Sequence, residues 1–187
     1  METRITMYKK KFSTQELTLI GMLTAVLSVL SILQIPMPSG VPFTLQTFAV
    51  ALCGYVLGYR KGMFCILLYL LIGFVGLPVF TGMTAGIGKL FGFTGGFLYG
   101  FLVLAGLCGT GTRCRNGILS ISAGIAGLLI FHLLGAVHYS VVASCGLAQA
   151  LFLVSLPYLL KDLLSVLGAY LVSVTVRRIC ARAGVVL

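Results

Sequence analysis

Charge is scarce in this sequence of 187 residues, of which 9% are charged and only 3 are acidic, whereas 59% are hydrophobic. Soluble domains carry about 25% charged residues. Tryptophan is absent, and the mean hydropathy is +1.14. This composition excludes a disordered chain, a collagen-like chain and an ordinary soluble domain. At about 20 apolar residues for each membrane span, the chain has room for six or seven spans.

Motifs for catalysis and for nucleotide or metal binding are also missing. Residues 82–92 resemble a phosphate-binding loop only superficially, because Met83 stands where the loop requires glycine and Leu90 replaces its hydroxyl residue. His132 and His138 are six residues apart, unlike the four of a helical metal pair. The sequence has no serine elbow, H-E-x-x-H motif or paired carboxylates. We therefore expect no enzyme activity, no metal and no cofactor, and any ATP must be hydrolysed by a partner.

Long uncharged segments separate small clusters of charge along the chain. They cover residues 17–59, 62–88, 90–112 and 116–160. We predict an all-α integral membrane protein with transmembrane helices at about 17–35, 44–59, 62–79, 93–111, 117–138 and 154–177. These six helices form one domain, residues 17–177, between an N-terminal segment 1–16 and a C-terminal tail 178–187.

The basic residues of this six-helix arrangement fall mainly on one side. Lysine and arginine next to a span tend to stay in the cytoplasm. One side collects 11 of the 13 basic residues, namely Arg4, Lys9, Lys10, Lys11, Arg60, Lys61, Arg113, Arg115, Arg177, Arg178 and Arg182. Only Lys89 and Lys161 fall on the other side. We therefore predict cytoplasmic termini, and we read the net charge of +10 as a topology signal, not as a site for nucleic acid.

Three charged residues, Lys89, Lys161 and Asp162, are not explained by topology and are expected near the outer face. An ionisable residue at the centre of a membrane helix costs about 2.5–3.5 kcal/mol, so it persists where it has a partner or lines a wet cavity. Two interpretations remain open. Lys161 and Asp162 lie among lipid headgroups at the end of the last helix, or all three residues converge on a polar ligand.

Gly21 and Ala25 are small residues four positions apart near the start of the first helix. Small residues at this spacing let two helix backbones approach closely. The pair serves either packing within the bundle or contact with a helix of a partner protein.

Five short motifs follow one another along the chain: V-P-F-T-L-Q-T at 41–47, L-G-Y-R-K-G at 57–62, Y-L-L-I-G at 69–73, G-L-P-V-F at 76–80 and G-F-T-G-G-F at 92–97. In this order they resemble the motifs of the BioY family, the biotin-specific membrane components of energy-coupling-factor (ECF) transporters. In the last segment Phe93 replaces the proline of the family pattern. The resemblance covers residues 17–177, nearly the whole chain.

The resemblance implies a six-helix substrate-binding (S) component in the bacterial cell membrane. Such a subunit captures biotin on the outer side and delivers it inward together with a transmembrane coupling protein and two ATPases. Its partners would be biotin, membrane lipid and these subunits. The family's site lies on the outer side, under the connections after helices 1, 3 and 5, where the three unexplained charges fall.

Biotin's chemistry suggests a role for each candidate residue. A carboxylate is the strongest acceptor for the ureido N–H groups, and a cation suits the valerate carboxylate or the ureido oxygen. Aromatic side chains suit the apolar ring system. The candidates are Asp162 as the acceptor, Lys89 and Lys161 as cations, Phe43, Phe80, Tyr99 and Tyr158 as aromatic walls, and Thr44, Gln46 and Thr84 as neutral hydrogen-bonding groups.

One departure from the family pattern falls in the last helix. The family commonly has D-x-x-K there, whereas Ser165 stands three residues after Asp162 and the lysine is at Lys161. Residues 161 and 165 share a helical face, so we expect Lys161 to reach the space of the missing lysine.

Alternative functions are an S component for a different vitamin, a ligand-free membrane structural partner, and, disfavoured by the missing motifs, a membrane enzyme.

Overall fold

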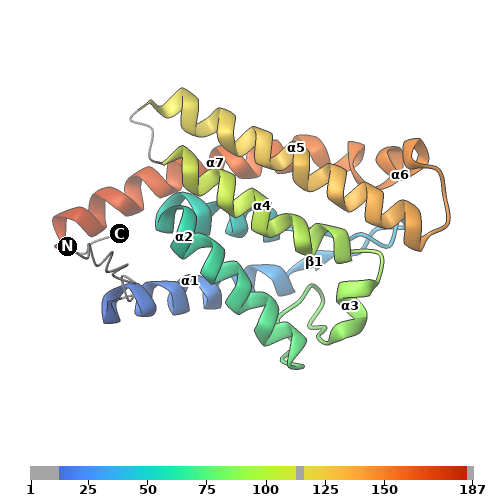
Figure 1. Cartoon of the computed structure of the whole chain (residues 1–187), viewed down its shortest axis with the longest axis horizontal. Helices are drawn as coiled ribbons and strands as arrows, with labels where there is room; N and C mark the ends of the chain where they lie inside the picture. Colours follow the sequence, from blue (N-terminus) through green and yellow to red (C-terminus); the bar gives the residue numbers. More distant parts are fainter. Residues whose placement is uncertain (1–12, 113–115, 185–187) are drawn as a thin grey trace, which may run out of the picture.

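The structure is a computed structural model that describes residues 13–112 and 116–184. The described part is mainly helical, as predicted, and also contains a short antiparallel ribbon that the sequence did not indicate. Its elements in order are α1 (Thr14–Ile32), β1 (Gln34–Ile35), β2 (Phe43–Thr44), α2 (Gln46–Phe74), α3 (Ile87–Phe91), α4 (Gly95–Gly111), α5 (Gly117–Val142), α6 (Leu147–Val154) and α7 (Leu156–Arg182). Figure 1 shows the long helices running side by side as an elongated bundle.

Four helices of the described chain, α1, α2, α5 and α7, are long and apolar enough to cross a membrane, and α4 is a shorter apolar helix. A single helix, α2, covers most of the two helices expected at 44–59 and 62–79, but it begins at Gln46 and ends at Phe74. At Gly58 the backbone has a φ of 76°, which departs from helical geometry and divides α2 into two parts. Glycine adopts this conformation at little steric cost. The short helices α3 and α6 were not predicted.

Local capping explains where three of the helices begin. Ser13 accepts a hydrogen bond from the Glu16 backbone N–H at 3.2 Å, and the Glu16 carboxylate accepts one from the Ser13 N–H at 2.8 Å, so a capping box starts α1. Asn116 accepts from the Ile118 N–H at 3.0 Å at the start of α5. Pro157 occupies the first turn of α7, where its missing N–H leaves no helical hydrogen bond unmade.

Glycines allow α4 to pack closely between α2 and α5. A Cβ added at Gly54 of α2 would lie 3.0 Å from the Ala105 Cα of α4. A Cβ added at Gly100 of α4 would lie 3.2 Å from the Phe131 Cα of α5. Larger residues at either glycine would separate the helices, so the small residues fix the central three-helix core.

Two polar contacts define one end of the bundle. The Lys61 ammonium lies 2.7 Å from the Glu16 carboxylate, and the Arg177 guanidinium donates to the Tyr55 carbonyl oxygen at 3.2 Å. The start of α1, the break at Gly58 and the end of α7 therefore lie together, whereas β1 and α3 lie at the opposite end (Figure 1). Six residues of the predicted basic side, Arg4, Lys9, Lys10, Lys11, Arg113 and Arg115, fall outside the described residues.

Candidate ligand-binding site

A pocket lies at the end of the bundle opposite the Gly58 break. Residues from the β2 region, α2, the α2–α4 connection, α4, α5 and α7 line it. It contains about 570 Å³ of space not filled by atoms, including the part open to solvent. Seven of the ten residues expected to bind ligand lie in its wall, namely Thr44, Gln46, Phe80, Lys89, Tyr158, Lys161 and Asp162.

One side of the pocket carries an ion pair. Asp162 is only 3% exposed, and its Oδ1 contacts the ammonium of Lys161. A buried carboxylate without a partner is strongly destabilising, so Lys161 compensates a charge that the protein interior disfavours. Asp162 and Lys161 therefore form a buried charged centre rather than an exposed pair among lipid headgroups.

The same lysine fixes the loop above the pocket. Its ammonium donates to the Thr44 carbonyl oxygen at 3.0 Å and lies 4.9 Å from the centre of the Phe43 ring. Tyr158, one turn earlier on α7, donates to the Val41 carbonyl oxygen. Two residues of α7 thus hold residues 41–44 in place over the charged centre.

Gln46 is oriented by neutral hydrogen bonds at the start of α2. Its amide nitrogen donates to the Tyr69 hydroxyl at 2.6 Å, and its amide oxygen accepts from the Thr81 hydroxyl at 3.2 Å. The Tyr69 hydroxyl donates in turn to the Val79 carbonyl oxygen at 3.2 Å. This chain of bonds connects both parts of α2 to the loop that follows it, and so shapes the pocket floor.

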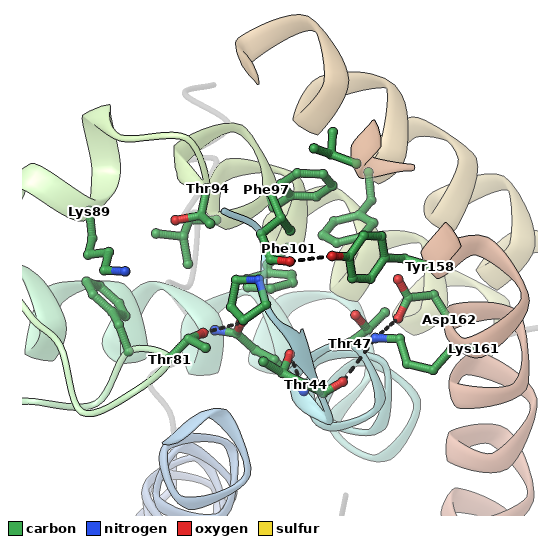
Figure 2. A pocket seen from close by; sticks show the side chains of 17 residues that line it. Thr44, Thr47, Thr81, Lys89, Thr94, Phe97, Phe101, Tyr158, Lys161 and Asp162 are labelled. Carbon is green, nitrogen blue, oxygen red and sulfur yellow. Dashed lines mark hydrogen bonds and ion pairs between the residues drawn. The ribbon is translucent and has the colours of Figure 1, made fainter. Parts of the chain in front are cut away.

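Lys89 of α3 lies on the other side of the pocket from Asp162 and Lys161 (Figure 2). Its backbone N–H donates to the Gly86 carbonyl oxygen at 3.2 Å, but its ammonium takes part in no ion pair or hydrogen bond within the described residues. A half-buried cation without an anion is suited to a negatively charged ligand group. The pocket thus has an ion pair on one side and an unpaired cation on the other.

The aromatic wall between the two sides differs from the sequence prediction. It comes largely from Phe97 and Phe101 of α4 and Phe131 of α5, none of which the sequence indicated. Thr47, Thr81 and Thr94 add further polar groups that were also missed. Phe97 and Phe101 are four residues apart and share one helix face. That periodicity is the signal that could have identified them.

Three expected residues lie outside the pocket wall. Tyr99 is 41% exposed and donates to the Leu90 carbonyl oxygen at 3.0 Å. Being two residues from Phe97, it points to a different face of α4. Thr84 donates to the Thr81 carbonyl oxygen at 2.9 Å. Phe43 is adjacent to the pocket through its contacts with Lys161 and Tyr158.

Gly21 and Ala25 lie on an exposed face of α1. A Cβ added at Gly21 would have no atom within 4 Å. Neither residue is buried within the described bundle. The described residues also include no group of three or more His, Cys, Asp or Glu side chains that could hold a metal ion.

The fold and the site define a multi-pass membrane protein with a small-ligand pocket at one end of its helical bundle. A profile of the BioY family matches residues 6–182, and the chain belongs to this family. The resemblance found in the sequence motifs is thereby confirmed.

Relatives of known name agree with this assignment. The biotin transporter BioY of Thermotoga maritima is 32% identical over 160 residues, which is 85% of this chain and 94% of that protein. The biotin transporter BioY of Rhodobacter capsulatus is 34% identical over 176 residues, covering 87% of this chain and 93% of that protein. Biotin transporter BioY2 of Lactococcus lactis is 57% identical over 95 residues, covering 51% of this chain and 52% of that protein.

A solved structure has the same fold. The crystal structure of the S-component for biotin from an ECF-type ABC transporter matches with a TM-score of 0.78 and 26% sequence identity. The match covers 90% of this chain and 94% of that chain. The helical arrangement described above is therefore that of an S component.

Proposed function

We propose that the chain is a biotin-binding S component that takes up biotin through the bacterial cell membrane as part of an ECF transporter. Its named relatives are biotin transporters, and its structural neighbour is the S-component for biotin. The family is one of transport proteins, so the chain is not an enzyme. The observation that carries the proposal is the pocket with Asp162 and Lys161 on one side and the unpaired Lys89 on the other.

Biotin has polar groups at its two ends that match the two sides of the pocket. The ureido N–H groups donate to the Asp162 carboxylate, which retains lone pairs beside its ion pair with Lys161. The valerate carboxylate extends toward Lys89, which supplies the opposite charge. The apolar thiophane ring lies between Phe97 and Tyr158, both of which line the pocket.

Lys161 takes the place of the lysine that the family commonly has at the position of Ser165. Its ammonium is in the pocket wall and contacts Asp162, whereas Ser165 is buried outside the wall. A long side chain that starts one residue before the carboxylate can thus supply the charge that the family usually supplies from three residues after it. The departure from D-x-x-K is compatible with a biotin site.

The proposed topology has six spans and cytoplasmic termini. In this topology the two parts of α2 on either side of the Gly58 break are separate spans, which together with α1, α4, α5 and α7 makes six. The end away from the pocket carries four basic residues, Arg60, Lys61, Arg177 and Arg178. Because lysine and arginine next to a span tend to stay in the cytoplasm, this end is assigned to the cytoplasmic side. The pocket then opens outward. A reporter that is active only in the cytoplasm should give a signal when it is fused after Leu187. A signal from a reporter that is active only in the periplasm or outside the cell would contradict this topology.

The exposed face of α1 is the proposed contact with the coupling protein. Gly21 and Ala25 leave room for a partner helix to approach the α1 backbone. Two ATPases joined to that coupling protein supply the energy, and no cofactor of the S component itself is required.

The replacement of the family lysine by Ser165 is the one observation that favours a different vitamin as the ligand. Thermal-shift measurement of the purified full chain with biotin, riboflavin, thiamine and niacin separates the alternatives. Ligand at 100 times its Kd adds about 2.7 kcal/mol to the free energy of unfolding. Stabilisation by biotin alone is expected. Stabilisation by another vitamin would contradict the choice of ligand, and no response to any of them would favour a ligand-free structural partner.

A further inference from the structure

His132 is a buried histidine in the middle of α5, close to the carboxylate of the charged centre. Its residue is 4% exposed, and its Nε2 lies 3.4 Å from the Asp162 Oδ2. The Lys161 ammonium contacts the other carboxylate oxygen, Oδ1. The Asp162 carboxylate therefore has a neighbour at each oxygen: the His132 imidazole of α5 lies near Oδ2, and the Lys161 ammonium of α7 contacts Oδ1.

The imidazole of His132 is held among aromatic rings. Its ring centre lies 6.2 Å from that of Phe97 with the planes 86° apart, and 5.1 Å from that of Phe131 with the planes 73° apart. The Ser155 hydroxyl donates to the His132 carbonyl oxygen at 3.3 Å and so fixes the backbone at this point. These contacts position the ring but offer no strong acceptor to its N–H.

Neither imidazole nitrogen of His132 has a hydrogen-bond partner among the described residues. A buried polar group without a partner costs about 1–3 kcal/mol. Asp162 Oδ2 at 3.4 Å is just beyond the usual range of about 2.7–3.2 Å for an N–H···O bond. Hydrogen bonds of functional sites are often long or poorly aligned in the free protein and tighten in the complex.

We propose that His132 is a positioning residue that holds the Asp162 carboxylate for the ureido ring of biotin. The imidazole donates its Nε2 proton to Oδ2, while Lys161 binds Oδ1. Each carboxylate oxygen keeps a lone pair that faces the pocket. The two protein contacts fix the plane of the carboxylate, so the ureido N–H groups meet acceptors already in position. This inference rests on the proposed biotin-binding function.

The test compares two replacements of His132 in the purified full chain, with biotin affinity measured by calorimetry or with radiolabelled biotin. His132→Phe keeps a ring of similar size and removes both nitrogens, so the affinity should fall about tenfold or more. His132→Gln keeps an N–H near the position of Nε2 and should recover most of the affinity. Leu129→Ala, one turn earlier on α5 at a residue that is 56% exposed, is the matched control and should bind as wild type does.

Two further readouts separate positioning of Asp162 from a general packing role. In the Asp162→Asn background, His132→Phe should cause little further loss, because the group that His132 positions is gone. Against biotin methylated on a ureido nitrogen, His132→Phe should cause a smaller loss than against biotin. Against biotinamide, which keeps the ureido ring and lacks the carboxylate, the loss should match that for biotin.

Several outcomes would overturn the proposal. A positioning role would be excluded by any of three results. His132→Phe could bind biotin as tightly as wild type, His132→Phe and His132→Gln could lose the same affinity, or the affinity losses of His132→Phe and Asp162→Asn could be fully additive. If His132→Phe does not fold, His132→Met makes the same comparison with His132→Gln. If the wild-type protein binds no biotin, the proposed function itself is refuted. If the wild-type protein and His132→Phe bind biotin equally well, only the role of His132 is refuted.

Discussion

Lys161 and Asp162 are consecutive residues of α7, yet the ammonium of one contacts the carboxylate of the other. Successive residues of a helix point about 100° apart, so they do not normally face each other. The contact forms because the long lysine side chain bends across the helix surface, where its ammonium also donates to the Thr44 carbonyl oxygen at 3.0 Å. This arrangement joins the buried carboxylate to the loop above the pocket.

Replacing Asp162 by asparagine should weaken biotin binding about tenfold or more, or about 1.4 kcal/mol. The amide keeps the shape of the side chain but removes the charge that strengthens the bonds from the ureido ring. Isothermal titration calorimetry of the purified protein measures the effect. Ser165→Ala is the control, since Ser165 lies one turn away on α7 and outside the pocket wall. Equal affinities of Asp162→Asn and wild type would remove Asp162 from the site.

Replacing Lys161 by alanine should weaken biotin binding and lower the melting temperature. Removal of one partner of a buried ion pair typically costs about 3–5 kcal/mol, because the other charge stays buried. The double variant Lys161→Ala/Ser165→Lys, which restores D-x-x-K, should recover much of the affinity. Binding by Lys161→Ala as tight as wild type would contradict the role assigned to this lysine.

Replacing Lys89 by methionine should abolish the preference for biotin over biotinamide. Lys89 is the cation proposed to meet the valerate carboxylate, and methionine keeps much of its length without the charge. Biotin affinity should fall about tenfold while biotinamide affinity stays nearly constant. Competition binding with the two ligands measures the ratio. A similar loss for both ligands would show that Lys89 does not recognise the carboxylate.

Replacing Gly73 by alanine should destabilise the protein and weaken biotin binding. A Cβ at Gly73 would overlap the ring of Phe80, which is 1% exposed and lines the pocket. Overpacking of this kind costs about 1–3 kcal/mol. Thermal unfolding with and without biotin measures both effects. Gly21→Ala is the control, because a Cβ there meets no atom within 4 Å; if both variants melt alike, the contact with Phe80 is not tight.

Replacing Gly21 by leucine should leave biotin binding intact and prevent assembly with the coupling protein. The side chain would project from the exposed face of α1, away from the pocket, and would keep a partner helix from close approach. Co-purification with the coupling protein and ATPases measures assembly, and calorimetry checks biotin binding. Normal assembly of Gly21→Leu would place the partner contact elsewhere.

The sequence alone determined the membrane class, the approximate positions of the long helices and the three charged residues of interest. Each follows from a property of residues near in sequence. The hydrocarbon core of a membrane disfavours charge, so most charged residues mark the ends of spans. A charged residue that topology does not explain must have another reason to persist. Lys89, Lys161 and Asp162 were identified in this way, and all three line the pocket.

Only the tertiary structure decided which other residues surround that pocket. Phe131 of α5 lines the pocket together with Asp162 of α7, and His132 lies close to the Asp162 carboxylate, because the helices pack side by side, a relationship that no local pattern encodes. Tyr99 was expected in the site and lies outside it because the rotation of α4 directs Phe97 and Phe101 inward instead. Helix rotation is set by the packing of all neighbouring helices together, whereas hydropathy in an apolar helix is nearly the same on every face.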